Sequence, residues 1–88
     1  MLRVMKRRPS ILIFMRILEL LREEPRGPTR LAQSVNLAYD KCAPYLQALE
    51  AKGLVRKDSR EGKDVFAVTQ DGVQVYLDWQ KVWEKLKP

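Results

Sequence analysis

The sequence predicts a mainly α fold of the α+β class, in which three helices are followed by a two-stranded β-hairpin and a fourth helix. Two observations predict it. Apolar residues recur at helical spacing in residues 11–23, 29–52 and 70–86. Between the last two of these segments, two short β-prone runs flank a turn that contains Gly62. The 88 residues are enough for one domain.

The first predicted helix begins after Ser10, a residue type that caps helices, and runs to about Glu23. Its apolar residues form two stripes, whereas a helix that covers a small core needs only one. One stripe contains Ile11, Phe14, Leu18 and Leu21, and the second contains Leu12, Met15 and, more loosely, Ile13, Ile17 and Leu20. We therefore expect a surface beyond the domain's own core to cover the second stripe.

A proline-bracketed connector around Gly27 separates this helix from a second one, predicted for residues 29–35. Asn36 follows, and asparagine tolerates the left-handed conformation that a sharp turn between helices requires. The third helix is predicted for residues 38–52, and Gly53 suits the position just after its end.

The hairpin is expected to pair strands at residues 54–58 and 64–68, with a turn between them in which Gly62 is free to adopt a positive φ. Thr69 is expected to cap the last helix, which covers residues 70–86.

The apolar spacing in residues 31–54 is that of two helices that cross steeply. Such a pair needs a small residue at the closest approach, apolar residues on both sides of the turn and an apolar stripe on the second helix. These positions are occupied by Ala32, Val35, Leu37, Cys42, Tyr45 and Leu49. The spacing is typical of a helix-turn-helix, and the following hairpin makes the order of a winged helix. A plain helical hairpin is the alternative.

Several motifs also resemble a known family. They are Gly27-Pro-Thr-Arg-Leu-Ala32, Asn36-Leu-Ala-Tyr-Asp-Lys41, Tyr45-Leu46, Leu49-Glu-Ala-Lys-Gly-Leu54 and Phe66-Ala-Val-Thr-Gln-Asp-Gly72. Over residues 10–86 the chain is similar to small archaeal winged helix-turn-helix proteins: predicted transcriptional regulators and the ten-kilodalton DNA-binding proteins that form coiled-coil dimers. The resemblance implies a winged helix that binds DNA and dimerises through its terminal helix. The chain departs from the family pattern at Pro44 and in a shorter C-terminal helix.

The net charge of +6 is concentrated at the N-terminus. Residues 1–9 contain no acidic residue and hold four cations: Arg3, Lys6, Arg7 and Arg8. A block of this kind favours contact with a polyanion, and a solubilising tail is the alternative. We expect a basic arm at residues 1–9, a winged helix-turn-helix domain at 10–68 and a terminal, dimer-forming helix at 69–88.

The third helix offers few groups for reading DNA bases. Tyr39 is a candidate for a phosphate contact, Lys41 for guanine or phosphate, and Gln47 for adenine. Asp40 can accept from a cytosine amino group, but we favour a local hydrogen bond to the first helical turn, where its charge suits the helix dipole. Pro44 is expected to bend this helix or to confine its regular part to the residues that follow.

Three further cations are candidates for contacts with the DNA backbone or minor groove: Arg30 in the second helix, and Arg60 and Lys63 at the tip of the hairpin. The alternating charges of the hairpin are equally compatible with a ribbon that is simply kept soluble. With the arm and Lys41, these groups would neutralise on the order of six to eight phosphates per subunit. Many phosphate contacts and few base contacts favour affinity over specificity.

The last helix carries the spacing of a short coiled-coil seam, formed by Val75, Trp79, Val82 and Leu86, with Tyr76 and Trp83 beside it. Together with Leu12 and Met15 of the first helix, these residues predict a homodimer interface. The alternative is that the last helix folds back within its own subunit.

Other functions find less support. There is no histidine and only one cysteine, Cys42, at a core position, so no metal site, cofactor or catalytic group is predicted and we do not expect an enzyme. No apolar run is long enough to span a membrane, and we expect a cytoplasmic protein whose partners are double-stranded DNA and a second copy of itself. A winged-helix protein-interaction module with little DNA affinity is the competing hypothesis.

Overall fold

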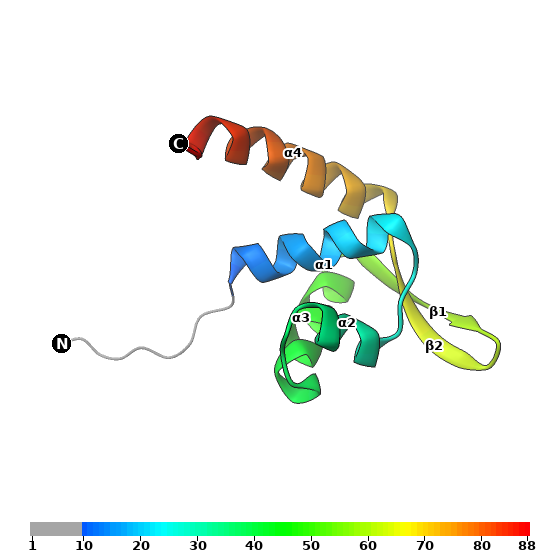
Figure 1. Ribbon diagram of the computed structural model, residues 1–88. Coiled ribbons are helices and arrows are strands. Elements are labelled where there is room, and N and C mark those ends of the chain that lie inside the picture. The colour runs from blue at the N-terminus through cyan, green and yellow to red at the C-terminus, as the bar shows by residue number, and fades with distance from the viewer. Residues whose placement is uncertain (1–9) are drawn as a thin grey trace.

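The computed structural model describes residues 10–88, so the predicted basic arm with Arg3, Lys6, Arg7 and Arg8 lies outside the described residues. In chain order the elements are α1 (Ile11–Glu23), α2 (Pro28–Ser34), α3 (Tyr39–Ala51), β1 (Val55–Arg60), β2 (Lys63–Val68) and α4 (Gln70–Leu86) (Figure 1). This order confirms the predicted α+β winged helix-turn-helix fold. The role of α4 in dimerisation stays a prediction.

The elements are arranged around α1. The helix α4 runs along one side of α1, α2 and α3 lie on the opposite side, and the hairpin projects from the end at which α1 finishes (Figure 1). Both sides meet in one apolar core, whose most deeply buried side chains are Ile17, Leu18, Leu31, Cys42 and Val55. The core therefore holds the helix-turn-helix, the hairpin and α4 as one unit.

The turn between α2 and α3 has the geometry that the sequence predicts. Asn36 has a φ of 60°, and the N–H groups of Asn36 and Leu37 donate to the carbonyls of Gln33 and Ala32 at 3.1 and 2.9 Å. This pair of bonds is a Schellman motif, which satisfies carbonyls that the end of a helix would otherwise leave free. Ala32 itself is buried, as the close crossing of the two helices requires.

The same motif ends α3, again with a left-handed residue. Gly53 has a φ of 75°, and the N–H of Leu54 donates to the carbonyl of Leu49 at 2.9 Å. The helix itself is regular from Tyr39 onward, so Pro44 does not confine its regular part to later residues. Pro44 has no N–H to donate to the carbonyl of Asp40, so α3 lacks one helical hydrogen bond at this turn.

The hairpin is longer and its turn tighter than predicted. The antiparallel strands pair from Val55 with Val68 to Arg60 with Lys63, and only Glu61 and Gly62 form the turn. Both turn residues have positive φ, 52° and 77°, which is typical of the two-residue turn that matches the twist of paired strands. Arg60 and Lys63 are therefore the last paired residues of the ribbon and not part of its loop.

The connector between α1 and α2 adds a contact that the sequence did not predict. Arg26 and Phe66 exchange two backbone hydrogen bonds, of 3.1 and 2.8 Å, so β2 is paired on both of its edges. The pairing fixes the base of the hairpin against α1 and α2.

The junction between the hairpin and α4 is equally constrained. The hydroxyl of Thr69 accepts from the N–H of Gly72 at 3.1 Å, as predicted for a helix cap, and donates to the carbonyl of Gly53 at 2.7 Å. Because Gly53 follows α3, this one side chain ties the start of α4 to the end of α3. Gly72 is buried where α4 approaches the backbone of Leu54.

The second apolar stripe of α1 is covered largely by the chain itself. Met15 and Tyr76, both predicted for a dimer interface, are only 7% and 6% exposed and belong to the core of a single chain. Ile17 and Leu20, of the same stripe, are also buried. The first half of α4 supplies the cover, so Met15 and Tyr76 have little area left for a partner.

Candidate nucleic-acid interface

The exposed side of α3 faces away from α1 and collects most of the base-reading candidates. Cys42, Leu46 and Leu49 point into the core, so the outer side of this helix is left to polar residues. Tyr39, Lys41 and Gln47, together with Arg30 in the neighbouring α2, are all exposed, as predicted for DNA-contacting residues. Their roles stay predictions.

Asp40 does not form the local hydrogen bond to the first turn of α3 that we expected. Its carboxylate makes no hydrogen bond or ion pair to any residue of the described range 10–88. Only its position in the first turn of α3 suits the helix dipole. The carboxylate therefore stands exposed beside Pro44, which is exposed too.

The wing, as we call residues 55–68, carries its cations unevenly. Near its base Arg56 pairs with Asp58 at 3.4 Å, and the ammonium of Lys57 lies 5.8 Å from the centre of the Phe66 ring. At its far end, Arg60 and Lys63 lie opposite each other and are exposed, and neither forms an ion pair within residues 10–88. The far end thus holds two exposed cations that no carboxylate of the described residues pairs with, and both are candidates for a phosphate contact.

The root of the predicted arm is attached directly to α3. The backbone N–H of Ser10 donates to the hydroxyl of Tyr45 at 2.9 Å, across 35 positions of sequence. The ring of Tyr45 also packs edge-on against Phe14, with 4.8 Å between ring centres. The helical spacing predicts only that Tyr45 faces the core, and nothing in the local sequence signals that its hydroxyl contacts Ser10.

These features lie on neighbouring elements of the fold. The helix α3 lies between the beginning of α1, where Ser10 stands, and the hairpin, which projects at the other end (Figure 1). Arg30 lies on α2, and Tyr39, Lys41 and Gln47 lie on α3, which packs against α2.

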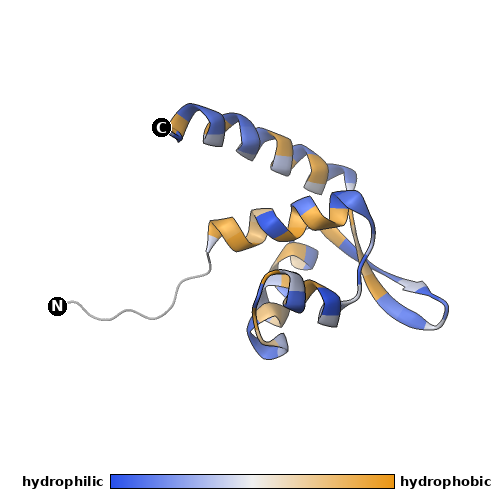
Figure 2. Cartoon of the chain, in the orientation of Figure 1, coloured by the Kyte–Doolittle hydropathy of each residue, from blue (hydrophilic) through white to orange (hydrophobic). Residues whose placement is uncertain are grey.

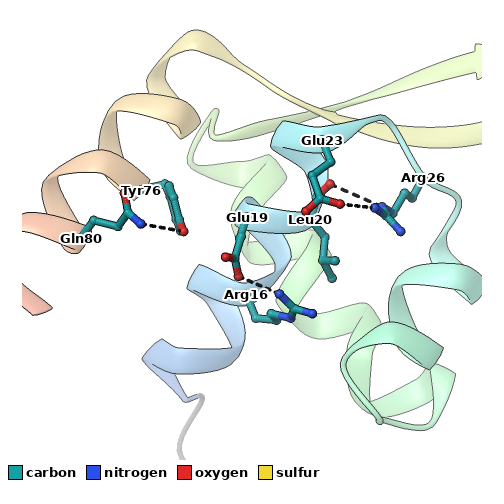
Figure 3. A network of polar contacts seen from close by, with 7 residues as sticks. All are labelled: Arg16, Glu19, Leu20, Glu23, Arg26, Tyr76 and Gln80. Carbon is teal, nitrogen blue, oxygen red and sulfur yellow. Dashed lines mark hydrogen bonds and ion pairs between the residues drawn. The ribbon is translucent and has the colours of Figure 1, made fainter.

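Not every cation is available. The guanidinium of Arg26 is largely buried, bonds to a carboxylate oxygen of Glu23 at 2.8 Å and reaches the carbonyl of Leu20 at 3.4 Å (Figure 3). On earlier turns of α1, the guanidinium of Arg16 pairs with the carboxylate of Glu19 at 2.8 Å. These ion pairs brace α1 and the connector and leave Arg26 no part in the interface.

A second candidate surface lies at the beginning of α1 and the end of α4. Leu12, Val82, Trp83 and Leu86 are 55%, 48%, 43% and 69% exposed, and Ile11 is exposed beside Leu12. Val75 and Trp79 are half-buried against the core, and the rings of Trp79 and Trp83 stack 6.0 Å apart. Hydrophobic segments mark both of these helix ends (Figure 2). We call the exposed residues 11, 12, 82, 83 and 86 the apolar end; of the predicted interface residues, Leu12, Val82 and Trp83 lie in it.

The single thiol is a core group. Cys42 is fully buried, and this burial raises the pKa of its thiol, which keeps it protonated and unreactive near neutral pH. Within residues 10–88, no group of three or more potential metal-ligating side chains comes together. No helix in that range is long and apolar enough to cross a membrane.

Comparison with known proteins gives one family and several structural neighbours. The winged helix-turn-helix family model matches residues 7–87. Among curated proteins, none matches the chain.

The solved structures that superpose on this chain include regulators of transcription. The transcriptional regulator BldR from Sulfolobus solfataricus has a TM-score of 0.79 and 29% identity, over 85% of this chain and 56% of that one. The homodimeric winged helix-turn-helix DNA-binding domain of Mb0332 from Mycobacterium bovis has a TM-score of 0.74 and 21% identity, over 86% and 71%. MepR, a transcription regulator from Staphylococcus aureus, has a TM-score of 0.76 and 13% identity, over 84% and 58%. The last two share the fold, and this chain spans just over half the length of BldR.

Proposed function

This chain belongs to the winged helix-turn-helix family, and on that premise we propose that it binds duplex DNA as a homodimer, with modest sequence preference, as a transcriptional regulator or an architectural protein. The observation that carries the proposal is that α3, with its exposed polar residues, packs against α2 and is followed by the projecting hairpin (Figure 1). A helix of this kind fits the major groove, and a ribbon beside it reaches the backbone or a minor groove.

Each candidate has a role in this proposal. Gln47 faces base edges, and Lys41 contacts a guanine or a phosphate. Tyr39 and Arg30 hold phosphates near the helix-turn-helix, and Arg60 and Lys63 hold the backbone at the end of the wing. The arm, which precedes Ser10, adds four cations. If all eight cations engage, the slope of log K against log salt is roughly −7 per subunit, and with six it is roughly −5.

The homodimer is proposed to form through the apolar end. Apolar side chains exposed on two neighbouring helices cost free energy in water, at about 25 cal/mol per Å² of apolar surface, and pairing with a second copy removes that surface from water. The DNA-binding domain of Mb0332 is homodimeric, which supports this assignment. The narrower resemblance to ten-kilodalton archaeal dimers stays a prediction; BldR, one of the structural neighbours, is from an archaeon.

The first test is a DNA-binding titration of the full chain at two salt concentrations. Phosphate contacts are screened least at about 50 mM salt and more strongly at about 200 mM. We expect binding at the lower concentration that weakens steeply at the higher one. Removal of residues 1–8 should lower the affinity more than Gln47→Ala does, because it deletes four cations.

Two results would count against the proposal. An absence of binding at the lower salt concentration would favour the competing protein-interaction module. A larger loss from Gln47→Ala than from removal of the arm would mean that base readout, and not phosphate contact, dominates the affinity.

A further inference from the structure

The outward stripe of α3 has an unusual composition for a helix that faces DNA. At about 100° per residue, the positions opposite the core are 40, 44, 47 and 51. They are occupied by Asp40, Pro44, Gln47 and Ala51, all of which are exposed. The stripe contains no cation, since Lys41 lies on its flank. A side chain at the centre of this stripe meets base edges before it meets phosphates.

Asp40 is the charged group on this stripe. Its carboxylate is exposed and makes no hydrogen bond or ion pair within residues 10–88. Its backbone carbonyl also lacks the usual helical donor, because the residue four positions later is Pro44, which has no N–H. The carboxylate of Asp40 is therefore the acceptor that the outward stripe offers in this turn, and the neighbouring donor, Lys41, lies on the flank of the stripe.

We infer that Asp40 is a specificity-determining residue that accepts a hydrogen bond from the N4 amino group of cytosine in the major groove; this inference rests on the proposed function. An ionised carboxylate only accepts. Cytosine presents an amino donor there without an acceptor on the same base edge, whereas adenine places its N7 acceptor beside its amino group. Guanine and thymine present acceptors, which repel a carboxylate. Cytosine is thus the base that matches Asp40 best.

The inference also explains why an acidic residue is compatible with a phosphate-binding face. Asp40 weakens the attraction to every sequence alike, because its charge repels phosphates. It is favourable only at a site where a base amino group compensates for that repulsion. The carboxylate therefore discriminates by opposing binding elsewhere, as well as by one attractive contact.

The experiment is an in vitro selection from a pool of random duplexes, with the full chain and the variants Asp40→Asn and Glu50→Gln. Glu50 is a matched control because it is an exposed carboxylate on the flank of the same helix. Both substitutions remove one negative charge, so both should raise the affinity for unrelated sequences by about two- to fivefold. Thermal unfolding of each variant verifies that the fold is retained.

The selected sequences decide the matter. The wild-type chain should enrich cytosine at one position of each half-site by about tenfold over other bases. Asp40→Asn should shift that position to adenine, whose N6 and N7 atoms an amide matches, and Glu50→Gln should leave cytosine in place. A position that keeps its preference in Asp40→Asn, or loses it in Glu50→Gln, would overturn the inference. If the wild-type chain retains no duplex at about 50 mM salt, the proposed function itself fails.

Discussion

Gly72→Ala should destabilise the domain strongly, although alanine is the better helix former. A Cβ at this position would overlap the backbone carbonyl oxygen of Leu54 and would lie 2.7 Å from Cγ2 of Val68. Since one of the two neighbours is backbone, rotation of a side chain cannot relieve the contact. The start of α4 must move away from residue 54.

The size of the effect follows from what that movement breaks. Thr69 would lose its N–H bond to the carbonyl of Leu54, at 3.1 Å, and its hydroxyl bond to Gly53, at 2.7 Å. Each is worth about 1 kcal/mol, and the remaining overlap adds about 1–3 kcal/mol. Alanine returns about 1 kcal/mol of helix propensity. The free energy of unfolding should therefore fall by about 2–4 kcal/mol.

The assay is thermal and urea unfolding of the wild-type chain and two glycine variants. For a domain of this size, about 2 kcal/mol lowers the unfolding midpoint by at least about 8 °C. Gly27→Ala is the control, because its Cβ would meet only the carbonyl oxygen of Asp64 at an ordinary 3.5 Å. The free energy of unfolding of the Gly27→Ala variant should differ from that of the wild-type chain by no more than about 1 kcal/mol. If Gly72→Ala is as stable as Gly27→Ala, the close approach of α4 to residue 54 is wrong.

Three further predictions concern the turn, the apolar end and the root of the arm. Asn36→Val should cost about 1–2 kcal/mol in urea unfolding, because a β-branched residue resists the φ of 60°, whereas Asn36→Gly should be nearly neutral. Trp83→Ala should weaken self-association at least about tenfold in sedimentation equilibrium, with Lys81→Ala as the unaffected control; a wild-type chain that is monomeric throughout would contradict this. Tyr45→Phe removes the acceptor of the Ser10 N–H and should cost about 1 kcal/mol of stability. It should lower DNA affinity only while residues 1–8 are present, and an equal loss without them would rule out an effect through the arm.

Local signals in the sequence were enough for the framework of the fold. Asn36 and Gly53 mark the two left-handed turns, and Ser10 and Thr69 mark the beginnings of α1 and α4, because these residue types act within a few positions of themselves. The same local information placed the buried spacing of the helix-turn-helix.

Contacts between distant segments were not predictable in the same way. The pairing of Arg26 with Phe66 and the bond from Ser10 to Tyr45 join residues that lie 40 and 35 positions apart, and neither partner's neighbours signal the other. Periodicity identified Met15 and Tyr76 as apolar positions, but it does not tell which surface covers them. For the candidate interface, helical spacing predicted the exposed side of α3, whereas only the structure shows that Asp40 forms no ion pair with any other residue of the range 10–88.

The central claim is that α2, α3 and the wing present their polar side chains to one nucleic-acid surface. The most direct measurement is a map of backbone amide shifts of the full chain by NMR, with and without a duplex at about 50 mM salt. We expect the largest changes in residues 29–47 and 57–64, and little change on the outer side of α4 at residues 74, 78 and 81. Changes confined to α4, or none at all with excess duplex, would contradict the claim.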